Sequence, residues 1–253
     1  MKNIFKRFYS LFLVATLAIL LTSCFDLKEE ITINKDGSGS FIQTIDMGSN
    51  PMIQMALNMQ SDSAKNANKD MNKMDSTMEE TKVKLSKIKG ISNIKTASST
   101  EELKYTIMYD FADIDALNRA INTAEKNKEG EEKGELKVMK KLYSFKKGQL
   151  TKANLFSMGD SGMDMSELMG DKKENGTEQT EEEKAQMKQM LQMFFGNANY
   201  TYIVHVPNKV KSYSNKKNTT VSEDGKTLTM TIPFMELLQE DKKANVGNSV
   251  KFK

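Results

Sequence analysis

The sequence is poor in the residues that build disulfides and metal centres. Its 253 residues contain one cysteine, one histidine and no tryptophan. A single cysteine excludes a disulfide within the chain and any zinc site built from several cysteines. The lone histidine, His205, falls within an alternating strand pattern, and a catalytic or metal-binding histidine would need partners. We interpret His205 as a side chain on the polar face of that strand.

The chain also lacks an excess of charge of one sign. It holds 37 Lys and Arg residues against 34 Asp and Glu. Three of the bases and none of the acids precede residue 24, so 34 of each remain in residues 24–253. No basic arm or stripe is present that would indicate binding to nucleic acid.

The N-terminal apolar run is too short to cross a bilayer. Residues 11–21 are almost wholly apolar, whereas a transmembrane helix needs about 20 such residues. The run follows three bases and precedes Thr22, Ser23 and Cys24. This is the order of a signal peptide, with a charged region, an apolar region and a small-residue processing site. We predict that residues 1–23 are a removable export signal.

The segment Leu21-Thr22-Ser23-Cys24 resembles the lipobox of bacterial lipoprotein precursors. That processing needs a thiol, because sulfur is the nucleophile that takes up the diacylglyceryl group. The resemblance implies that Cys24 becomes the acylated first residue of the mature protein, carrying chains such as palmitate. Each buried methylene contributes about 0.8 kcal/mol, so two or more chains hold a protein to a membrane. The alternative, an ordinary buried thiol, is disfavoured by the position of Cys24 directly after an export signal. We therefore expect a membrane-anchored protein of the bacterial cell envelope, exposed to the periplasm or the cell surface.

Residues 24–253 predict a single α+β domain. Alternating apolar residues broken by turns predict hairpins around 36–39, 147–148 and 223–226. Other strand-like runs are 91–97, 103–111, 200–206 and 249–252, and helical patterns cover 51–88, 113–121, 180–196 and 233–238. Because strands and helices do not alternate as in a parallel sheet, we expect an antiparallel sheet built from hairpins with helices packed on one face. Residues 157–180, with glycines among acids and lysines, predict a mobile insertion.

Two segments resemble the LppM-type family of bacterial lipoproteins. They are Ile33-Asn34-Lys35-Asp36-Gly37-Ser38-Gly39 and Tyr202-Ile203-Val204-His205-Val206-Pro207-Asn208-Lys209-Val210. The resemblance implies a sheet-and-helix domain with a concavity for a lipid or a protein partner. This chain departs from the family in having no tryptophan and no C-terminal hydrophobic anchor, and no functional residue is carried over.

No catalytic constellation stands out in the sequence. Acids occur in mixed runs with lysine, such as Lys28-Glu29-Glu30, which we interpret as solvated surface. Asp36-Gly37-Ser38-Gly39 contains Gly-x-Gly but lacks the remaining residues of a dinucleotide fingerprint or a P-loop, so it is interpreted as a hairpin turn. We predict a chain that is not an enzyme and has no catalytic residue, no metal and no cofactor.

Methionine is the compositional oddity, with 19 copies. Met187, Met190 and Phe194 lie on the apolar stripe of the helix predicted from residue 180, and we predict that they form a ligand-binding surface. The expected function is non-enzymatic binding of a lipid, a peptide or an envelope protein. Two alternatives stay open. Met163-Asp164-Met165 is typical of a periplasmic copper-binding protein, and carboxylates that converge only in the fold would indicate an enzyme.

Overall fold

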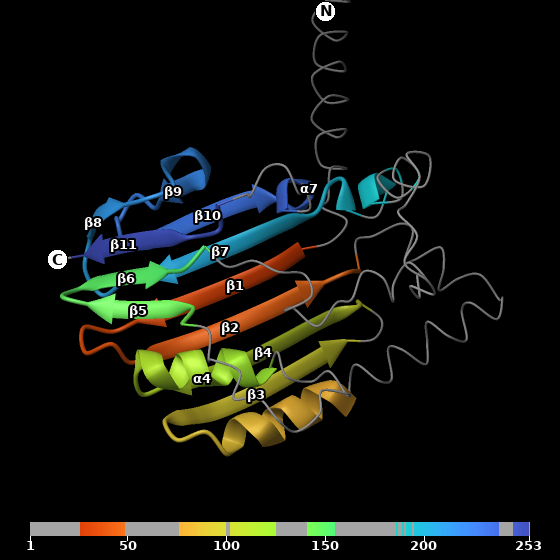
Figure 1. Cartoon of the computed structure of the whole chain (residues 1–253), viewed down its shortest axis with the longest axis horizontal. Coiled ribbons are helices and arrows are strands. Elements are labelled where there is room, and N and C mark those ends of the chain that lie inside the picture. The colour runs from red at the N-terminus through yellow and green to blue at the C-terminus, as the bar shows by residue number, and fades with distance from the viewer. Residues whose placement is uncertain are drawn as a thin grey trace, which may run out of the picture.

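The computed structural model describes residues 26–48, 76–99, 102–124, 141–154, 186, 189, 191–193, 195–237 and 245–252. These residues form two β-sheets accompanied by helices, which is an α+β architecture with more sheet than helix (Figure 1). Within these ranges, none of the helices has the length and hydropathy needed to span a membrane. The predicted α+β class is therefore confirmed.

The larger sheet has seven strands in the order β3-β4-β2-β1-β7-β10-β9. Their bounds are β1 (Asp26–Ile33), β2 (Gly39–Asp46), β3 (Ile91–Ser99), β4 (Lys104–Phe111), β7 (Asn199–His205), β9 (Thr219–Val221) and β10 (Thr227–Pro233). Neighbouring strands are antiparallel except in the centre, where β1 and β7 are parallel with Leu27 opposite Tyr200.

The smaller sheet is antiparallel, in the order β5-β6-β11-β8. Its strands are β5 (Tyr143–Lys146), β6 (Gln149–Lys152), β8 (Val210–Tyr213) and β11 (Asn248–Phe252). Together with α4 (Ile114–Ala124), this sheet lies in front of the larger one (Figure 1). The described residues also include a helix at 76–86, the 3-10 turn η1 (Lys216–Asn218) and the short helix α7 (Phe234–Leu237).

The predicted antiparallel sheet with helices on one face is wrong in two respects. The central pair β1 and β7 is parallel, and a four-stranded sheet shares the covered face with α4. Parallel neighbours need a long crossover, and here the crossover runs from Ile33 to Asn199 and includes β2 to β6. Hairpin chemistry specifies only strands that are adjacent in sequence, so it does not reveal this pairing.

Local turn and cap chemistry agrees with the sequence. In the turn between β1 and β2, Asp36 Oδ1 accepts hydrogen bonds from the backbone N–H and the hydroxyl of Ser38, at 3.0 and 2.7 Å. Gly37 adopts a φ of 90°, which an L side chain rarely tolerates. At the start of α4, Asp113 Oδ1 accepts the backbone N–H of Ala116 at 2.7 Å and so caps the helix, which agrees with the helical pattern predicted from residue 113.

The core lies between the larger sheet and the layer that covers it. Along β7, Tyr200, Tyr202 and Val204 are buried, whereas the residues between them are half-buried on the opposite face. The buried set continues across the larger sheet with Ile31 and Phe41, and from the covering layer it includes Leu117, Tyr143, Leu150 and Val250. Burial of each large apolar side chain contributes about 1.5–3 kcal/mol, so this shared core holds the two layers together.

Candidate functional site

None of the predicted site residues is among those that the structure describes. Cys24, Met187, Met190 and Phe194 lie outside the described residues, as do the predicted signal at 1–23 and the predicted insertion at 157–180. Met193, a described residue between Met190 and Phe194, has an exposed fraction of 52%. Val83, on another helix, is equally exposed. The structure therefore tests neither the acylation of Cys24 nor the proposed methionine surface.

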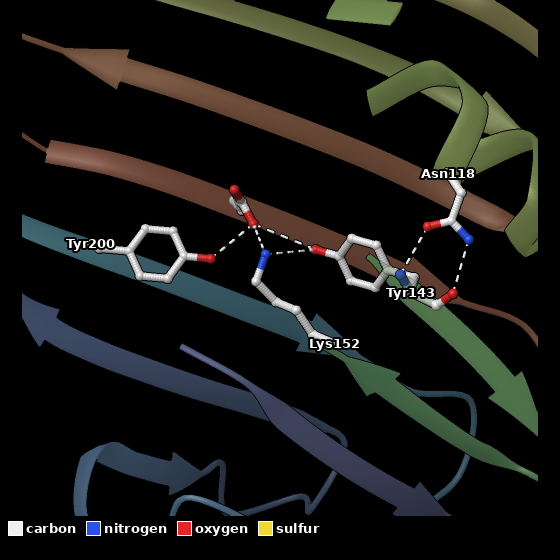
Figure 2. Close-up of polar contacts among 5 residues, drawn as sticks. Asn118, Tyr143, Lys152 and Tyr200 are labelled. Atoms are coloured by element: carbon white, nitrogen blue, oxygen red, sulfur yellow. Dashed lines mark hydrogen bonds and ion pairs between the residues drawn. The ribbon is translucent and has the colours of Figure 1, made fainter. Parts of the chain in front are cut away.

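The structure reveals a buried polar cluster that the sequence did not predict. Glu29 lies on β1 between Leu27 and Ile31, on the face that points into the core. Its Oε2 accepts hydrogen bonds from Lys152 Nζ at 2.8 Å, from the Tyr200 hydroxyl at 2.8 Å and from the Tyr143 hydroxyl at 3.4 Å. Figure 2 shows Lys152 reaching between Tyr200 and Tyr143.

Three tyrosine rings surround the Lys152 ammonium. Its Nζ lies 5.1 Å from the ring centroid of Tyr143, 5.2 Å from that of Tyr202 and 5.8 Å from that of Tyr200. An ammonium this close to a ring face is attracted by the electrons of the ring. Only 7% of the Lys152 side chain and 15% of the Glu29 side chain remain exposed.

The tyrosines of this cluster are held in their neutral form. Burial raises the pKa of the Tyr200 hydroxyl well above its usual range, and the neighbouring Glu29 carboxylate raises it further. The same two causes raise the pKa of Tyr202 and of Tyr109. For Tyr143, burial again comes first, followed by repulsion from Tyr202 and Glu29. These hydroxyls therefore stay protonated across the neutral and moderately alkaline range.

The cluster extends into α4 through a second pair of hydrogen bonds. Asn118 Nδ2 donates to the backbone carbonyl of Tyr143 at 2.9 Å, and the backbone N–H of Tyr143 donates to Asn118 Oδ1 at 2.8 Å (Figure 2). Asn118 is itself buried. One connected network therefore joins β1 and β7 of the larger sheet, β5 and β6 of the smaller sheet, and α4.

This arrangement is suited to joining layers. One oxygen of Glu29 already accepts three donors, and the ammonium of Lys152 is paired and enclosed by rings. In the described part of the chain, no three His, Cys, Asp or Glu side chains are grouped so that they could hold a metal ion.

The prediction that Glu29 belongs to solvated surface is wrong. A charged run hides the period-2 pattern, in which Glu29 shares a face with Leu27 and Ile31. On β6, Lys152 likewise shares a face with Leu150, and Leu150 and Lys152 are both buried. The alternation of apolar neighbours was the signal that could have revealed both residues.

The opposite face of the larger sheet carries a smaller polar cluster. His205 Nε2 lies 2.8 Å from Glu30 Oε1, its Nδ1 lies 3.1 Å from the Thr227 hydroxyl, and Lys28 Nζ pairs with Glu30 at 2.8 Å. Burial raises the pKa of the Glu30 carboxyl, but hydrogen bonds from Lys28 and His205 outweigh this effect and hold the pKa below its usual value. The prediction that His205 lies on the polar face of a strand is confirmed.

Comparisons with known proteins give one similarity. No protein-family model and no curated protein matches the chain. Among solved structures, the chain is similar to the folded domain of the Mycobacterium tuberculosis protein LppM, determined by NMR. The two are 10% identical with a TM-score of 0.33, and the match covers 91% of this chain and 90% of that chain. This TM-score is too low to assign a common fold, so membership of the LppM-type family stays a prediction.

Proposed function

We propose that this chain is the precursor of a bacterial envelope lipoprotein, and that acyl chains on Cys24 anchor its mature domain to a membrane. The observation that carries the proposal is the short distance in sequence between the lipobox-like segment and the first strand of the fold. The lipobox-like segment ends at Cys24, and the central strand β1 begins at Asp26. Removal of residues 1–23 therefore leaves every described residue of both sheets in place.

The position of the cleavage site is constrained on both sides. Cleavage within β1 would remove part of a strand that pairs with both β2 and β7 and that carries Glu29. Cleavage well before Cys24 would leave part of the apolar run, residues 11–21, on the mature chain. Cleavage directly before Cys24 avoids both outcomes.

We further propose that the anchored domain acts by binding and not by catalysis. The polar cluster inside the domain satisfies its own charges, because Glu29 and Lys152 are paired at 2.8 Å and largely enclosed. The function then rests on a surface that a lipid, a peptide or an envelope protein can contact. Acyl chains supply the attachment, since residues 24–253 are formally neutral and offer no strong electrostatic substitute.

The test is fractionation of cells that express Cys24→Ser, with Ser23→Ala as the matched control. Ser23→Ala keeps a small residue before the cleavage site and keeps the thiol. We expect the parent and Ser23→Ala to incorporate labelled fatty acid and to stay with membranes after a high-salt wash, whereas Cys24→Ser does neither. Retention of Cys24→Ser in the washed membranes would show that the lipoprotein assignment is wrong.

A further inference from the structure

At the end of the larger sheet where β1 begins, the terminal residues of neighbouring strands are in register and form a row. The strand registers place Asp26 opposite Asp46 on one side and Asn199 on the other. The row continues to Lys104 and Ser99 in one direction and to Pro233 in the other. Six neighbouring strands therefore begin or end in one row, and this row contains Asp26, two residues after Cys24.

The link to Cys24 is too short to hold the domain away from a membrane. Only Phe25 separates Cys24 from Asp26, and two extended residues span at most about 7 Å. Adjacent strands lie about 4.8 Å apart, so Pro233, two strands from Asp26 in the row, is about 10 Å away. An acylated Cys24 therefore brings the bilayer surface within reach of the start of α7, which follows Pro233 directly.

Two short helical segments are locked together beside this row. The rings of Phe195 and Phe234 stack with centroids 5.2 Å apart, and the backbone N–H of Phe234 donates to the carbonyl of Ala198 at 2.8 Å. Figure 1 places α7 at this end of the sheet, where β10 stops. These contacts hold α7 against the segment that precedes β7, at the end of the sheet where β1 begins.

Apolar side chains on these segments remain partly uncovered. Met193 has an exposed fraction of 52%. Four further apolar side chains near this end of the sheet are half-buried against the core: Leu191, Met235 and Leu237 on the helical segments, and Met47, which directly follows β2. We call these five residues the membrane edge.

The charges near the membrane edge do not favour an anionic surface. Asp26 and Glu236 are acidic, and Lys104 is paired with Asp46 at 3.7 Å. Attraction to anionic lipids needs clustered Lys and Arg side chains, which these residues do not provide. Contact with the acyl boundary of a neutral bilayer needs only apolar side chains at the right height.

Val83 shows that exposure alone does not define the membrane edge. Its exposed fraction is also 52%, but it lies on the helix at 76–86, which leads into the start of β3. There Ile91 is opposite Phe111, and Phe111 is opposite Gly39 at the far end of the sheet. An equally exposed apolar residue therefore lies away from the anchor.

We propose that the membrane edge rests on the neutral lipid surface in which Cys24 is anchored, with Met193 and Met235 in contact with lipid. This inference rests on the proposed acylation of Cys24. It gives the domain a fixed orientation, with the turn between β1 and β2 pointing away from the bilayer.

The absence of tryptophan makes the proposal directly testable. Acylated protein carrying Met193→Trp or Met235→Trp is reconstituted into phosphatidylcholine vesicles that contain brominated chains, with Val83→Trp as the matched control. We expect several-fold stronger quenching of fluorescence for the two edge tryptophans than for the control, and no change when the salt concentration is raised. Mass spectrometry of the same samples reports the acylation of Cys24 separately. Equal or absent quenching at the edge positions in acylated protein would overturn the orientation and leave the lipoprotein assignment intact, whereas unacylated Cys24 would refute the assignment itself.

Discussion

Glu29 and Glu30 are neighbours on β1, yet they face opposite sides of the larger sheet. Each carboxylate forms an ion pair of 2.8 Å with a lysine ammonium: Glu29 with Lys152, and Glu30 with Lys28. The first lysine is 7% exposed and the second 43%. Equal ion-pair lengths therefore occur in very different surroundings, and the energetic importance of each pair follows from burial. The inner pair joins the layers of the domain, whereas the outer pair lies on a face that water reaches.

The largest expected effect is loss of stability at alkaline pH, caused by the tyrosines that face the core with Glu29. The folded-state pKa is raised for Tyr109, Tyr143, Tyr200 and Tyr202, so the unfolded chain loses these protons first. Their contribution is complete below about pH 10, the ordinary tyrosine pKa, and is lost as pH rises above it. Above that pH each tyrosine contributes about 1.4 kcal/mol per pH unit, and four contribute about 5.5 kcal/mol per unit.

Urea unfolding of the Cys24→Ser form between about pH 9 and pH 11 measures this slope. Tyr109→Phe should lower the slope by about 1.4 kcal/mol per pH unit. A free energy of unfolding that stays flat through this range would contradict the burial of these hydroxyls.

The second prediction compares the two lysines under the same substitution. Lys152→Met leaves Glu29 buried without its cation and should cost about 3–5 kcal/mol. Lys28→Met removes an exposed partner of Glu30 and should cost under about 1 kcal/mol. Chemical denaturation at neutral pH measures both. The double variant Glu29→Gln/Lys152→Met should recover part of the loss, because no unpaired charge remains. Similar costs for the two single variants would remove the distinction between the faces.

A smaller effect is expected from the Tyr200 hydroxyl. Tyr200→Phe removes a hydrogen bond of 2.8 Å to the Glu29 carboxylate, which should cost about 1.5–3 kcal/mol because the acceptor is charged. The control is Tyr213→Phe, at a half-buried tyrosine on β8, and its free energy of unfolding should lie within about 0.5 kcal/mol of the parent. An unfolding free energy for Tyr200→Phe that matches the control would show that Glu29 does not depend on this donor.

The smallest effect is expected on the outer face. The folded pKa of Glu30 is depressed, so its contribution to stability is present above its ordinary pKa and is lost as pH falls through the folded value. Glu30 and its two partners are partly exposed to water, so this contribution should stay under about 1 kcal/mol. NMR titration should show the Glu30 pKa moving up toward its usual value in His205→Gln. An unchanged Glu30 pKa in that variant would show that His205 does not support the carboxylate.

Short-range chemistry is what the sequence predicts well. The hairpin turn at Asp36, the cap of α4 by Asp113 and the alternation of β7 all depend on residues a few positions apart. The strand β8 and the turn η1 were missed, because their short polar sequences carry little periodicity.

Long-range pairing is what the sequence does not predict. The parallel pairing of β1 with β7 joins segments about 170 positions apart, and no turn signal encodes it. The inner cluster has the same origin, since Glu29, Lys152 and Tyr200 come from three strands that are far apart in the sequence. The apolar neighbours of Glu29 and Lys152 place both side chains on the buried face, but their partners appear only in three dimensions.

The most direct test of the central claim is mass spectrometry of the N-terminal peptide of the protein isolated from its own membranes. The account predicts a peptide that begins at Cys24 and carries acyl chains on its sulfur, with β1 following from Asp26. A mature protein that begins elsewhere, or an unmodified Cys24 in membrane-bound protein, would contradict it.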